Sequence, residues 1–342
     1  MKAVFSGAQL AHAPSKFLQF GNLTGFPDSP ERARKLLEGA RIAQCRIFGA
    51  RKYAMSHFGG LVHNGVYLDF LVNGYGEWTA VPGAAPEMMP SLRPTVAYRN
   101  APKHILGRAG VHQMDFSCPI GPSTWASAAA SAMTAMTAAD FVLAGDPVVY
   151  ALCRPPGHHA CADRASGFCY LNNAALAATR LRTVHGRVAI LDIDVHHGNG
   201  TQFIFYSRDD VLFVSIHVDP REYYPFYWGY ANETGRGAGE GFTYNIPLPL
   251  GSGDGPWLAA IDLAIARIHA FAPGALVLSL GLDAHESDPL KGGTVTTAGY
   301  ARMASNISRM GLPAVIVQEG GYLTEHLADN LAMFLVSYEG GG

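Results

Sequence analysis

One stretch, AILDIDVHHGNGTQ at positions 189–202, restricts the fold of this chain more than any other. Its β-branched and leucine residues predict a strand, in which alternate side chains share a face, so Asp192, Asp194 and His196 should point the same way. Gly198-Asn199-Gly200 would then end the strand. Two carboxylates in an apolar strand are costly to bury without a cation. Because parallel α/β sheets bind ligands at the carboxyl ends of their strands, we expect a divalent metal there. The alternative is an acidic strand end that caps a turn.

The composition is that of a globular protein with a large core. Hydrophobic residues make up 49% of the 342 residues and charged residues 15%, and the formal net charge is −2. We therefore expect neither nucleic-acid binding nor a disordered acidic tail. The five cysteines are odd in number and form no CxxC pair, which is typical of reduced thiols in a cytoplasmic protein. The N-terminus lacks the apolar segment of a signal peptide.

Residues 116–139 contain no charged side chain, which raises the question of a membrane span. The helical part of this region, 123–144, consists mostly of Ala, Ser, Thr and Met. It lacks the Leu, Ile and Val of a spanning helix, so we expect a tightly packed buried helix and no membrane partner.

Short apolar segments alternate with amphipathic ones along the chain. The expected strands are 148–152, 188–191, 211–216, 275–280 and 314–317. The expected helices are 33–40, 123–144, 174–183, 257–271 and 299–310. Before the first of these helices, Ser29 is expected as N-cap and Pro30 at the first helical position. Strands without polar alternation are buried on both faces, which predicts an α/β fold, a parallel sheet between layers of helices. Residues 1–342 should form a single domain, with a loop-rich, proline-rich insertion at 74–122.

A metal site needs a third protein ligand, and Asp283 closely follows the expected strand 275–280. With Asp194 and His196 it gives two carboxylates and one imidazole. This set suits catalytic zinc or iron(II) and leaves room for water and substrate. Glu286 and Asp288 are nearby competitors, but they lie further into the loop and should be solvated or capping groups.

Two further groups follow other expected strands. His158 and His159 are adjacent in a loop restricted by Pro and Gly. One can act as general base on water and the other can stabilise charge or protonate the leaving group; the alternative is a pair of surface histidines. Tyr322 follows Gly320-Gly321, whose backbone freedom would let it reach over a cleft as an oxyanion-stabilising donor, although an aromatic residue after two glycines is usually just packed.

Five motifs occur in a fixed order: RPPGHH, GFCYLNNAA, LDIDVHHGNGTQ, SLGLDAHESDP and QEGGY. In order and spacing they resemble the zinc-dependent histone-deacetylase superfamily, from residue 28 to the C-terminus. The resemblance implies the arginase/deacetylase fold, with a parallel eight-stranded sheet and helices on both faces. Asn199, the segment YANETG at 230–235 and the long insertion look most like bacterial acetylpolyamine amidohydrolases. Class I histone deacetylases usually carry Asp at the position of Asn199.

The resemblance also implies a role for each matching residue. It makes Asp194, His196 and Asp283 the zinc ligands, His159 the general base, His158 its electrostatic partner, and Tyr322 the residue that polarises the scissile carbonyl. Asp192 and Asn199 match the residues behind the first and second histidine, Gly167 and Phe168 match the floor and wall of the acyl tunnel, and Tyr224 falls near the opposite wall. A structural potassium ion would bind near Asp192, Ser215 and Ile216 and the backbone of Asp194 and His196.

The insertion departs from these relatives in its charge. Characterised polyamine enzymes carry acidic residues there, which meet the ammonium groups of the substrate across a dimer interface. In this chain the segment 88–113, called here the basic segment, contains Arg93, Arg99, Lys103 and Arg108 and no acid. At the entrance it should repel a polycation, so neutral or singly charged amides should react at least as well, unless Asp115, Glu77 or Glu222 supplies negative charge. The insertion also predicts a homodimer, because Trp78, Met88, Met89, Leu92 and Tyr98 are of types found at interfaces.

Three classes of function follow. The first is a zinc-dependent amidohydrolase for small N-acetylated amines such as acetylpolyamines, with a broader hydrolase of neutral or aromatic amides and an acetyl-lysine deacetylase as alternatives within the same chemistry. The second is an arginase-like binuclear manganese ureohydrolase, which would need an Asp two residues after Asp283, where this chain has His285. The third is a non-catalytic acyl-binding relative, which retention of Tyr322 and both histidines disfavours.

Overall fold

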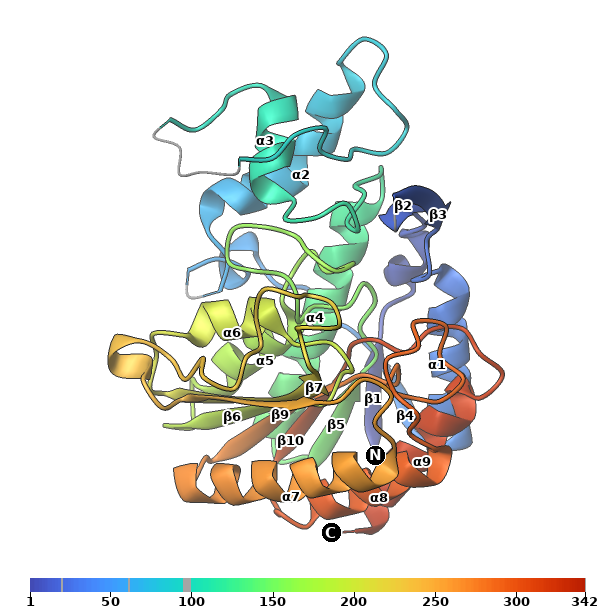
Figure 1. Cartoon of the computed structure of the whole chain (residues 1–342), viewed down its shortest axis with the longest axis vertical. Coiled ribbons are helices and arrows are strands. Elements are labelled where there is room, and N and C mark those ends of the chain that lie inside the picture. The colour runs from blue at the N-terminus through green and yellow to red at the C-terminus, as the bar shows by residue number, and fades with distance from the viewer. Residues whose placement is uncertain (20, 61, 95–99, 342) are drawn as a thin grey trace.

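A parallel eight-stranded sheet forms the centre of the protein in a computed structural model that describes residues 1–19, 21–60, 62–94 and 100–341 (Figure 1). Its strand order is β4-β1-β5-β10-β9-β6-β7-β8, and every neighbouring pair is parallel. The strands are β1 (Lys2–Phe5), β4 (Arg46–Gly49), β5 (Val148–Ala151), β6 (Val188–Asp192), β7 (Val211–Val218), β8 (Thr243–Leu248), β9 (Ala275–Leu280) and β10 (Ala314–Gln318). A separate antiparallel hairpin contains β2 (Lys16–Gln19) and β3 (Asn22–Gly25). The predicted α/β fold with an eight-stranded parallel sheet is confirmed.

All five expected strands are present, but the sequence did not predict the two edge strands or β1. β4 is largely exposed at one edge, and β8 at the other contains Pro247, which central strands avoid. The expected extent of the strand in 189–202 was wrong. β6 ends at Asp192, so Asp194 and His196 lie in the segment after the strand. Asn199, expected in a turn, begins helix α6 (Asn199–Phe205).

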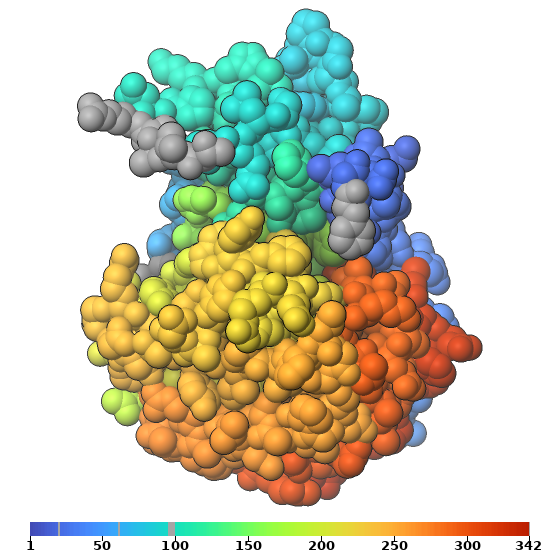
Figure 2. All heavy atoms as spheres, in the orientation of Figure 1, coloured from blue at the N-terminus to red at the C-terminus, as the bar shows by residue number. Residues whose placement is uncertain are grey.

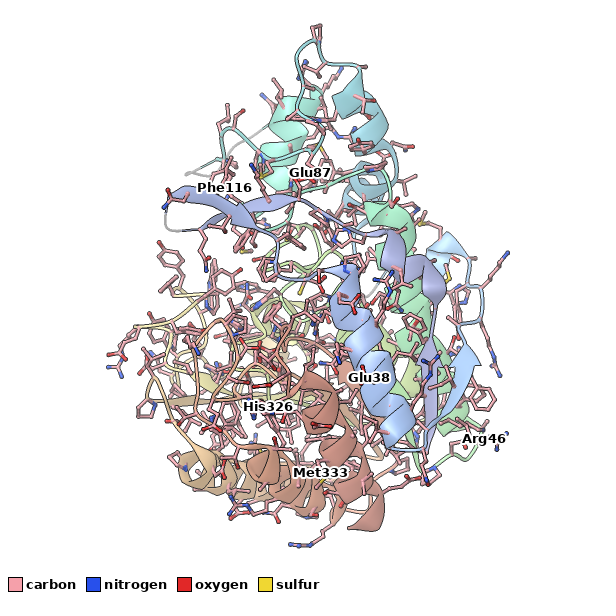
Figure 3. The ribbon with its side chains drawn as sticks, turned by 90° about the vertical axis from the view of Figure 1, so that its right-hand side faces the viewer. Glu38, Arg46, Glu87, Phe116, His326 and Met333 are labelled. Carbon is pink, nitrogen blue, oxygen red and sulfur yellow. The ribbon has the colours of Figure 1, made fainter. Side chains whose placement is uncertain are left out.

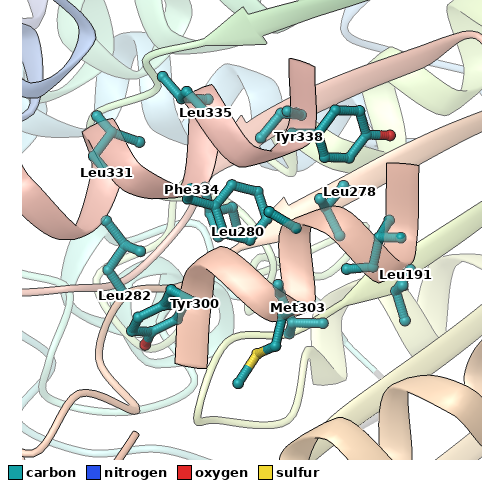
Figure 4. Close-up of a cluster of buried hydrophobic side chains, with 14 of the residues drawn as sticks. Leu191, Leu278, Leu280, Leu282, Tyr300, Met303, Leu331, Phe334, Leu335 and Tyr338 are labelled. Carbon is teal, nitrogen blue, oxygen red and sulfur yellow. The ribbon is translucent and has the colours of Figure 1, made fainter. Parts of the chain in front are cut away.

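Helices cover both faces of the sheet, because the side chains of each buried strand alternate between two cores. In β9, Leu276, Leu278 and Leu280 face one core, and Ala275 and Val277 face the other. The first core is closed by α1 (Pro30–Ile42), α7 (Asp254–Phe271), α8 (Thr297–Ser308) and α9 (Leu327–Gly340), and Figure 4 shows α8 and α9 packed on β9. The second is closed by α2 (Gly65–Thr79), α3 (Ile105–His112), α4 (Thr124–Leu143), α5 (Asn173–Leu181) and α6.

Helix α4 is the apolar segment that raised the question of a membrane span. Among the described residues it is the one helix long and apolar enough to cross a membrane, yet 72% of its most apolar window is buried inside the protein. Its small Ala, Ser and Thr side chains allow close packing against α5 and the sheet. The predicted buried helix is therefore present.

The insertion at 74–122 contains more helix than expected. It begins inside α2 and includes α3, and Figure 2 shows this cyan-to-green region as the upper part of the molecule. A bridge between Met88 and Ile120 closes its loops. Of the residues expected at an interface, Trp78 and Met88 are buried inside the chain, Leu92 is 64% exposed, and Tyr98 lies outside the described residues.

Candidate active site

The carboxyl ends of four neighbouring strands define the candidate site. β5, β10, β9 and β6 lie side by side in the sheet, and each is followed by a loop that carries predicted site residues. His158 and His159 follow β5, Tyr322 follows β10, Asp283 follows β9, and Asp194 and His196 follow β6. Residues far apart in the sequence thus meet at the carboxyl ends of the central strands.

The three predicted metal ligands form a compact buried group. One ligand atom from each of Asp194, His196 and Asp283 lies within 4.8 Å of the other two. Nδ1 of His196 is 3.0 Å from Oδ1 of Asp194 and 3.2 Å from Oδ2 of Asp283. Ligand atoms about 2.0–2.1 Å from one tetrahedral ion lie about 3.3 Å apart, so these spacings suit a single zinc-sized cation.

The surroundings of the two carboxylates also favour a cation. The N–H of Gly320 donates to Oδ2 of Asp194 at 2.7 Å, and the N–H of Val195 donates to Oδ1 of Asp283 at 3.1 Å. Oδ2 of Asp283 is buried and accepts no hydrogen bond, although it faces Nδ1 of His196. Burial, reinforced by the charge of Asp194, raises the pKa of Asp283. A bound cation would give the unbonded oxygen of Asp283 a partner and offset the repulsion between the two buried carboxylates. The residues present therefore fit a metal ion.

The adjacent histidines have different partners and therefore different charge states. His158 donates its Nδ1–H to Oδ2 of Asp192 at 3.0 Å, and His159 donates its Nδ1–H to Oδ1 of Asn199 at 2.6 Å. Burial disfavours the charged form of both rings. At His158 the carboxylates of Asp192 and Asp194 outweigh burial and raise the pKa to about 10. At His159 burial and the neighbouring histidines lower the pKa well below its usual value. His159 is thus neutral, with Nε2 as its proton acceptor.

Tyr322 is held by the turn that precedes it. Gly321 has φ of +102°, a left-handed conformation that favours glycine. The N–H of Tyr322 donates to Oδ2 of Asp288 at 2.9 Å, and the guanidinium of Arg32 lies 5.4 Å from the centre of the tyrosine ring. The tyrosine lines the same cavity as the histidines and two of the predicted metal ligands, Asp194 and His196.

A cavity of about 450 Å³ opens onto these side chains. Its aromatic lining comprises Phe17, Phe116, Phe168, Tyr223, Tyr224, Phe226 and Tyr322. The ring of Phe168 packs edge-on against that of Phe17 with centroids 5.3 Å apart, and the ring of Tyr224 lies 5.1 Å from that of His159. Phe168 and Tyr224 therefore lie where a tunnel wall was expected.

Gly167 lets the wall approach the histidines closely. Its φ is +53°, and a Cβ atom at this position would lie 2.2 Å from Cδ2 of His159. Only a residue without a side chain fits there, which agrees with its expected place at the floor of the tunnel.

Asp115 connects the two sides of the rim. Its Oδ2 accepts hydrogen bonds from the hydroxyl of Tyr224 at 2.6 Å, the hydroxyl of Ser166 at 3.0 Å and the N–H of Gly167 at 3.1 Å. Its Oδ1 accepts the N–H of Ser117 at 2.9 Å. One carboxylate therefore fixes the relative position of the tunnel floor and the aromatic wall.

The charge at the entrance differs from the expectation. Asp115 and Glu222 line the cavity, and none of the described Lys or Arg residues does. Arg108 forms ion pairs with two carboxylates of α2, one of them Glu77. The expectation that the basic segment lines the entrance is wrong for its described residues; Arg99 lies outside them.

Two buried carboxylates of the site were not predicted. Asp288, expected to be a solvated or capping group, is 2% exposed and accepts the N–H groups of Tyr322 and Leu290. Glu319 is fully buried and accepts the N–H groups of Gly157 and His158. The available signal for Glu319 was an acid directly after an apolar strand, the same signal that singled out Asp192.

His158, Cys169 and Glu319 form a second group of ligand-type atoms within 4.8 Å of one another. Each already has a hydrogen-bond partner: Asp192 for the imidazole Nδ1, the carbonyl of Gly167 for the thiol, and two amides for the carboxylate. This group is therefore satisfied without a metal ion.

The residues expected around potassium lie on two neighbouring strands. Asp192 and Ser215 are register partners on β6 and β7, and Ile216 follows directly. The carboxylate of Asp192 is bonded to His158 and to the N–H of Asp194, and the hydroxyl of Ser215 is 2.8 Å from Nδ1 of His217. Each of these oxygen atoms keeps a lone pair, so the side chains of Asp192 and Ser215 as well as backbone carbonyls are available to a cation here.

The sequence profile of the Histone deacetylase domain family matches residues 26–337, and the chain belongs to this family. It is 43% identical over 335 residues to the acetylpolyamine amidohydrolase of Burkholderia pseudomallei, covering 98% of this chain and 97% of that one. It is 42% identical to acetylpolyamine amidohydrolase 1 of Pseudomonas aeruginosa, covering 99% of each chain. The crystal structure of an acetylpolyamine aminohydrolase from Burkholderia pseudomallei aligns with a TM-score of 0.96 at 42% identity, covering 100% of this chain and 99% of that one.

The predicted relationship to the histone-deacetylase superfamily is confirmed, and with it the amidohydrolase class of enzyme and a metal-dependent active site. The arginase-like alternative loses support for a structural reason as well. His285, at the position where a second metal carboxylate would be needed, is 2.8 Å from the hydroxyl of Ser287 through Nδ1 and belongs to no described group of metal ligands.

Proposed function

We propose that this protein is a zinc-dependent deacetylase of small N-acetylated amines, with acetylpolyamines as favoured substrates. The observation that carries the proposal is the cavity, which leads to the metal ligands, the paired histidines and Tyr322. Its walls are aromatic, and Asp115 and Glu222 are its described charged residues apart from the histidines and the metal ligand Asp194. Aromatic faces and carboxylates both attract an ammonium group. The names of the full-length relatives agree with this substrate class.

The residues of the site divide the proposed reaction among them. Zinc held by Asp194, His196 and Asp283 would supply a Lewis acid that polarises the acetyl carbonyl and lowers the pKa of a water molecule to about 7; iron(II) suits the same ligands. His159 accepts the proton of the attacking water at Nε2, because its Nδ1–H is committed to Asn199.

The remaining groups stabilise charge and release the amine. The hydroxyl of Tyr322 donates to the carbonyl oxygen as negative charge develops on it. His158, kept protonated by Asp192, stabilises that charge electrostatically. An imidazolium of the pair then protonates the leaving nitrogen, so the products are acetate and the free amine.

The substrate class is tested by comparing kcat/KM for N-acetylputrescine and for neutral acetanilide at low and high salt. Carboxylates at the entrance should make the cationic amide the better substrate at low salt, and its advantage should shrink as salt rises. Glu222→Gln should lower kcat/KM for the acetylated diamine about two- to fivefold, because the carboxylate is exposed, and leave acetanilide unchanged. Glu325→Gln, an 87% exposed carboxylate outside the cavity lining, is the matched control. Salt-independent preference for acetanilide would instead support the broad amide hydrolase.

We also propose a homodimer that forms through the insertion. Exposed Leu92 and part-buried Met89 support it, whereas Trp78 and Met88 are used inside the protomer. Leu92→Glu should give a monomer in sedimentation at micromolar concentration, while Val184→Glu, which changes a 70% exposed residue between α5 and β6, should not. A wild-type monomer at this concentration would contradict the proposal.

A structural potassium ion bound by Asp192, Ser215 and Ile216 and by the backbone of Asp194 and His196 is part of the same proposal. Its support is the buried carboxylate pair Asp192 and Asp194, whose charge a second cation would offset. Replacing potassium by a bulky organic cation should lower the melting temperature of the zinc-loaded enzyme, and an unchanged melting temperature would count against the ion.

A further inference from the structure

Glu319 is a buried carboxylate that the proposed reaction does not use. It directly follows β10 in the middle of the sheet, and its N–H donates to the carbonyl of Leu280 at 2.8 Å. Oε2 accepts the N–H of Gly157 at 2.7 Å and the N–H of His158 at 3.0 Å. Oε1 accepts the hydroxyl of Ser279 on β9 at 3.3 Å. The side chain is therefore anchored to two central strands and reaches across to the loop after β5.

That loop carries both catalytic histidines and has no helix or strand of its own. Near the histidines its backbone is held by the N–H of Ala160 to the carbonyl of Gly157, the N–H of Thr201 to the carbonyl of His158, and the hydroxyl of Ser131 to the carbonyl of Pro155. The N–H groups of Gly157 and His158 themselves are bound by Glu319. Two successive N–H groups that converge on one carboxylate oxygen form an anion-binding nest, which sets the direction in which the chain continues. Asp192 and Asn199 hold the two rings at their Nδ1 atoms, and Glu319 fixes the backbone that carries them.

The residue that follows Glu319 extends this link to the metal ligands. The N–H of Gly320 donates to Oδ2 of Asp194 at 2.7 Å. Two consecutive residues thus hold the histidine loop with a side chain and a metal ligand with a backbone amide. Residues 319 and 320 therefore help to set the distance between the general base and the metal ligands, together with the bonds of the two histidines to Asp192 and Asn199.

We propose that Glu319 is a positioning residue that aligns the His158–His159 loop with the metal ligands and thereby contributes to kcat without contacting substrate. The inference rests on the proposed deacetylase function. The hydrogen-bond donors that the structure shows at its carboxylate are neutral N–H or O–H groups, and the proposal assigns the role to the acceptor atoms that bind them. The carboxylate also lies within 4.8 Å of the imidazole of His158, so the glutamine variant tests whether its charge is needed. A misplacement of about 1 Å at a reacting group costs up to about a hundredfold in rate.

The test compares three variants with the zinc-loaded wild-type enzyme. Glu319→Leu keeps the volume and removes the acceptors, so kcat should fall about 10- to 100-fold while KM changes less than about threefold. Glu319→Gln keeps an acceptor oxygen and should retain kcat within about fivefold. Glu319→Asp keeps the charge but shortens the side chain, and should lose about tenfold in kcat; it decides the matter if the leucine variant does not fold. Glu325→Leu is the control for loss of a carboxylate at an exposed position.

Two measurements that need no turnover complete the design. Zinc content should stay at one ion per chain in every variant, because no ligand has been changed. The Nδ1–H signal of His158 in proton NMR should shift in the leucine and aspartate variants and not in the glutamine variant. Loss of activity in glutamine and leucine variants alike, unchanged kcat in the leucine and aspartate variants, or loss of zinc would each overturn the proposal. If wild-type enzyme hydrolyses no acetylated amine, the proposed function fails, and the NMR signal still decides the positioning role.

Discussion

Gly320 lies so close to the proposed metal ligands Asp194 and Asp283 that adding a single methyl group should prevent metal binding. A Cβ atom on Gly320 would be 2.0 Å from Oδ2 of Asp283 and 2.5 Å from Oδ2 of Asp194. Real Cβ atoms keep at least 3.0 Å from such neighbours, so Oδ2 of Asp283 would have to retreat by about 1 Å. Metal–ligand distances tolerate about 0.2 Å. We therefore expect Gly320→Ala to lose one of three protein ligands without requiring a strained backbone.

The expected magnitude separates metal loss from simple destabilisation. Overpacking a buried position costs about 1–3 kcal/mol, so metal-free variant and metal-free wild type should differ by no more than this. Zinc at a hundredfold excess over its Kd stabilises the wild type by about 2.7 kcal/mol. The variant should gain little of that stabilisation, and its kcat/KM should fall on the order of a hundredfold or more.

The assay is thermal unfolding with and without zinc, combined with the zinc content of the dialysed protein. Gly255→Ala is the matched control, because a Cβ on this α7 residue meets nothing within 4 Å. It should bind zinc and gain stability as the wild type does. One zinc ion per chain and a wild-type gain in melting temperature for Gly320→Ala would refute the placement of the metal between these carboxylates.

Three further changes test other parts of the structure. Tyr322→Phe should lose about a hundredfold in kcat with little change in KM, as expected for removal of one oxyanion donor; a defect in KM alone would make Tyr322 a binding wall. Asp194→Asn should abolish turnover even in zinc-supplemented buffer, and full activity would contradict its role as a ligand. Asp28→Asn leaves the buried guanidinium groups of Arg32 and Arg154 without their carboxylate and should cost about 3–5 kcal/mol in urea unfolding at neutral pH. Burial disfavours the charged form of Asp28, but the charges of Arg154 and Arg32 outweigh burial and lower the pKa of Asp28 in the folded protein. The stability that the carboxylate contributes is therefore fully present above the unfolded-state pKa of about 3.9. It is lost as the pH falls through the lower pKa of the folded state. A difference between wild type and variant that persists undiminished in acid would contradict this account.

The residues at the strand ends could be predicted from the sequence. In a parallel sheet, a polar residue directly after a short apolar strand lies at the carboxyl end of the sheet, where ligands bind. Asp194 and Asp283 are of this kind, because they lie within three residues of the ends of β6 and β9. His158 lies further along the loop after β5 and was recognised from its pairing with His159. The walls of the cavity follow no such rule. Phe17 reaches the cavity from the β2–β3 hairpin, which contacts the backbone of Phe116, and Figure 3 shows that residue beside the hairpin.

The failed expectation about charge has a similar cause. Counting Lys and Arg in the basic segment gives the number of positive charges. It does not show which carboxylates lie next to them in the folded protein. The side chain of Arg108 in α3 is only 14% exposed and forms ion pairs with Asp69 and Glu77. Both carboxylates lie in α2, earlier in the sequence. Asp115, which follows the segment, turns inward to Tyr224. Which of these groups faces the entrance is decided by the packing of α2 on α3, and no local pattern records it.

The position of β10 has a consequence for how the enzyme matures on the ribosome. β10 is the last strand in the sequence, yet it pairs with β5 on one side and β9 on the other. Until it is synthesised, β4-β1-β5 and β9-β6-β7-β8 have no strand to join them. Such long-range pairing is slow to form. A nascent chain can therefore carry the aspartates, both histidines and a largely complete fold, and still lack a working centre until the segment from Ala314 to Tyr322 has entered the gap.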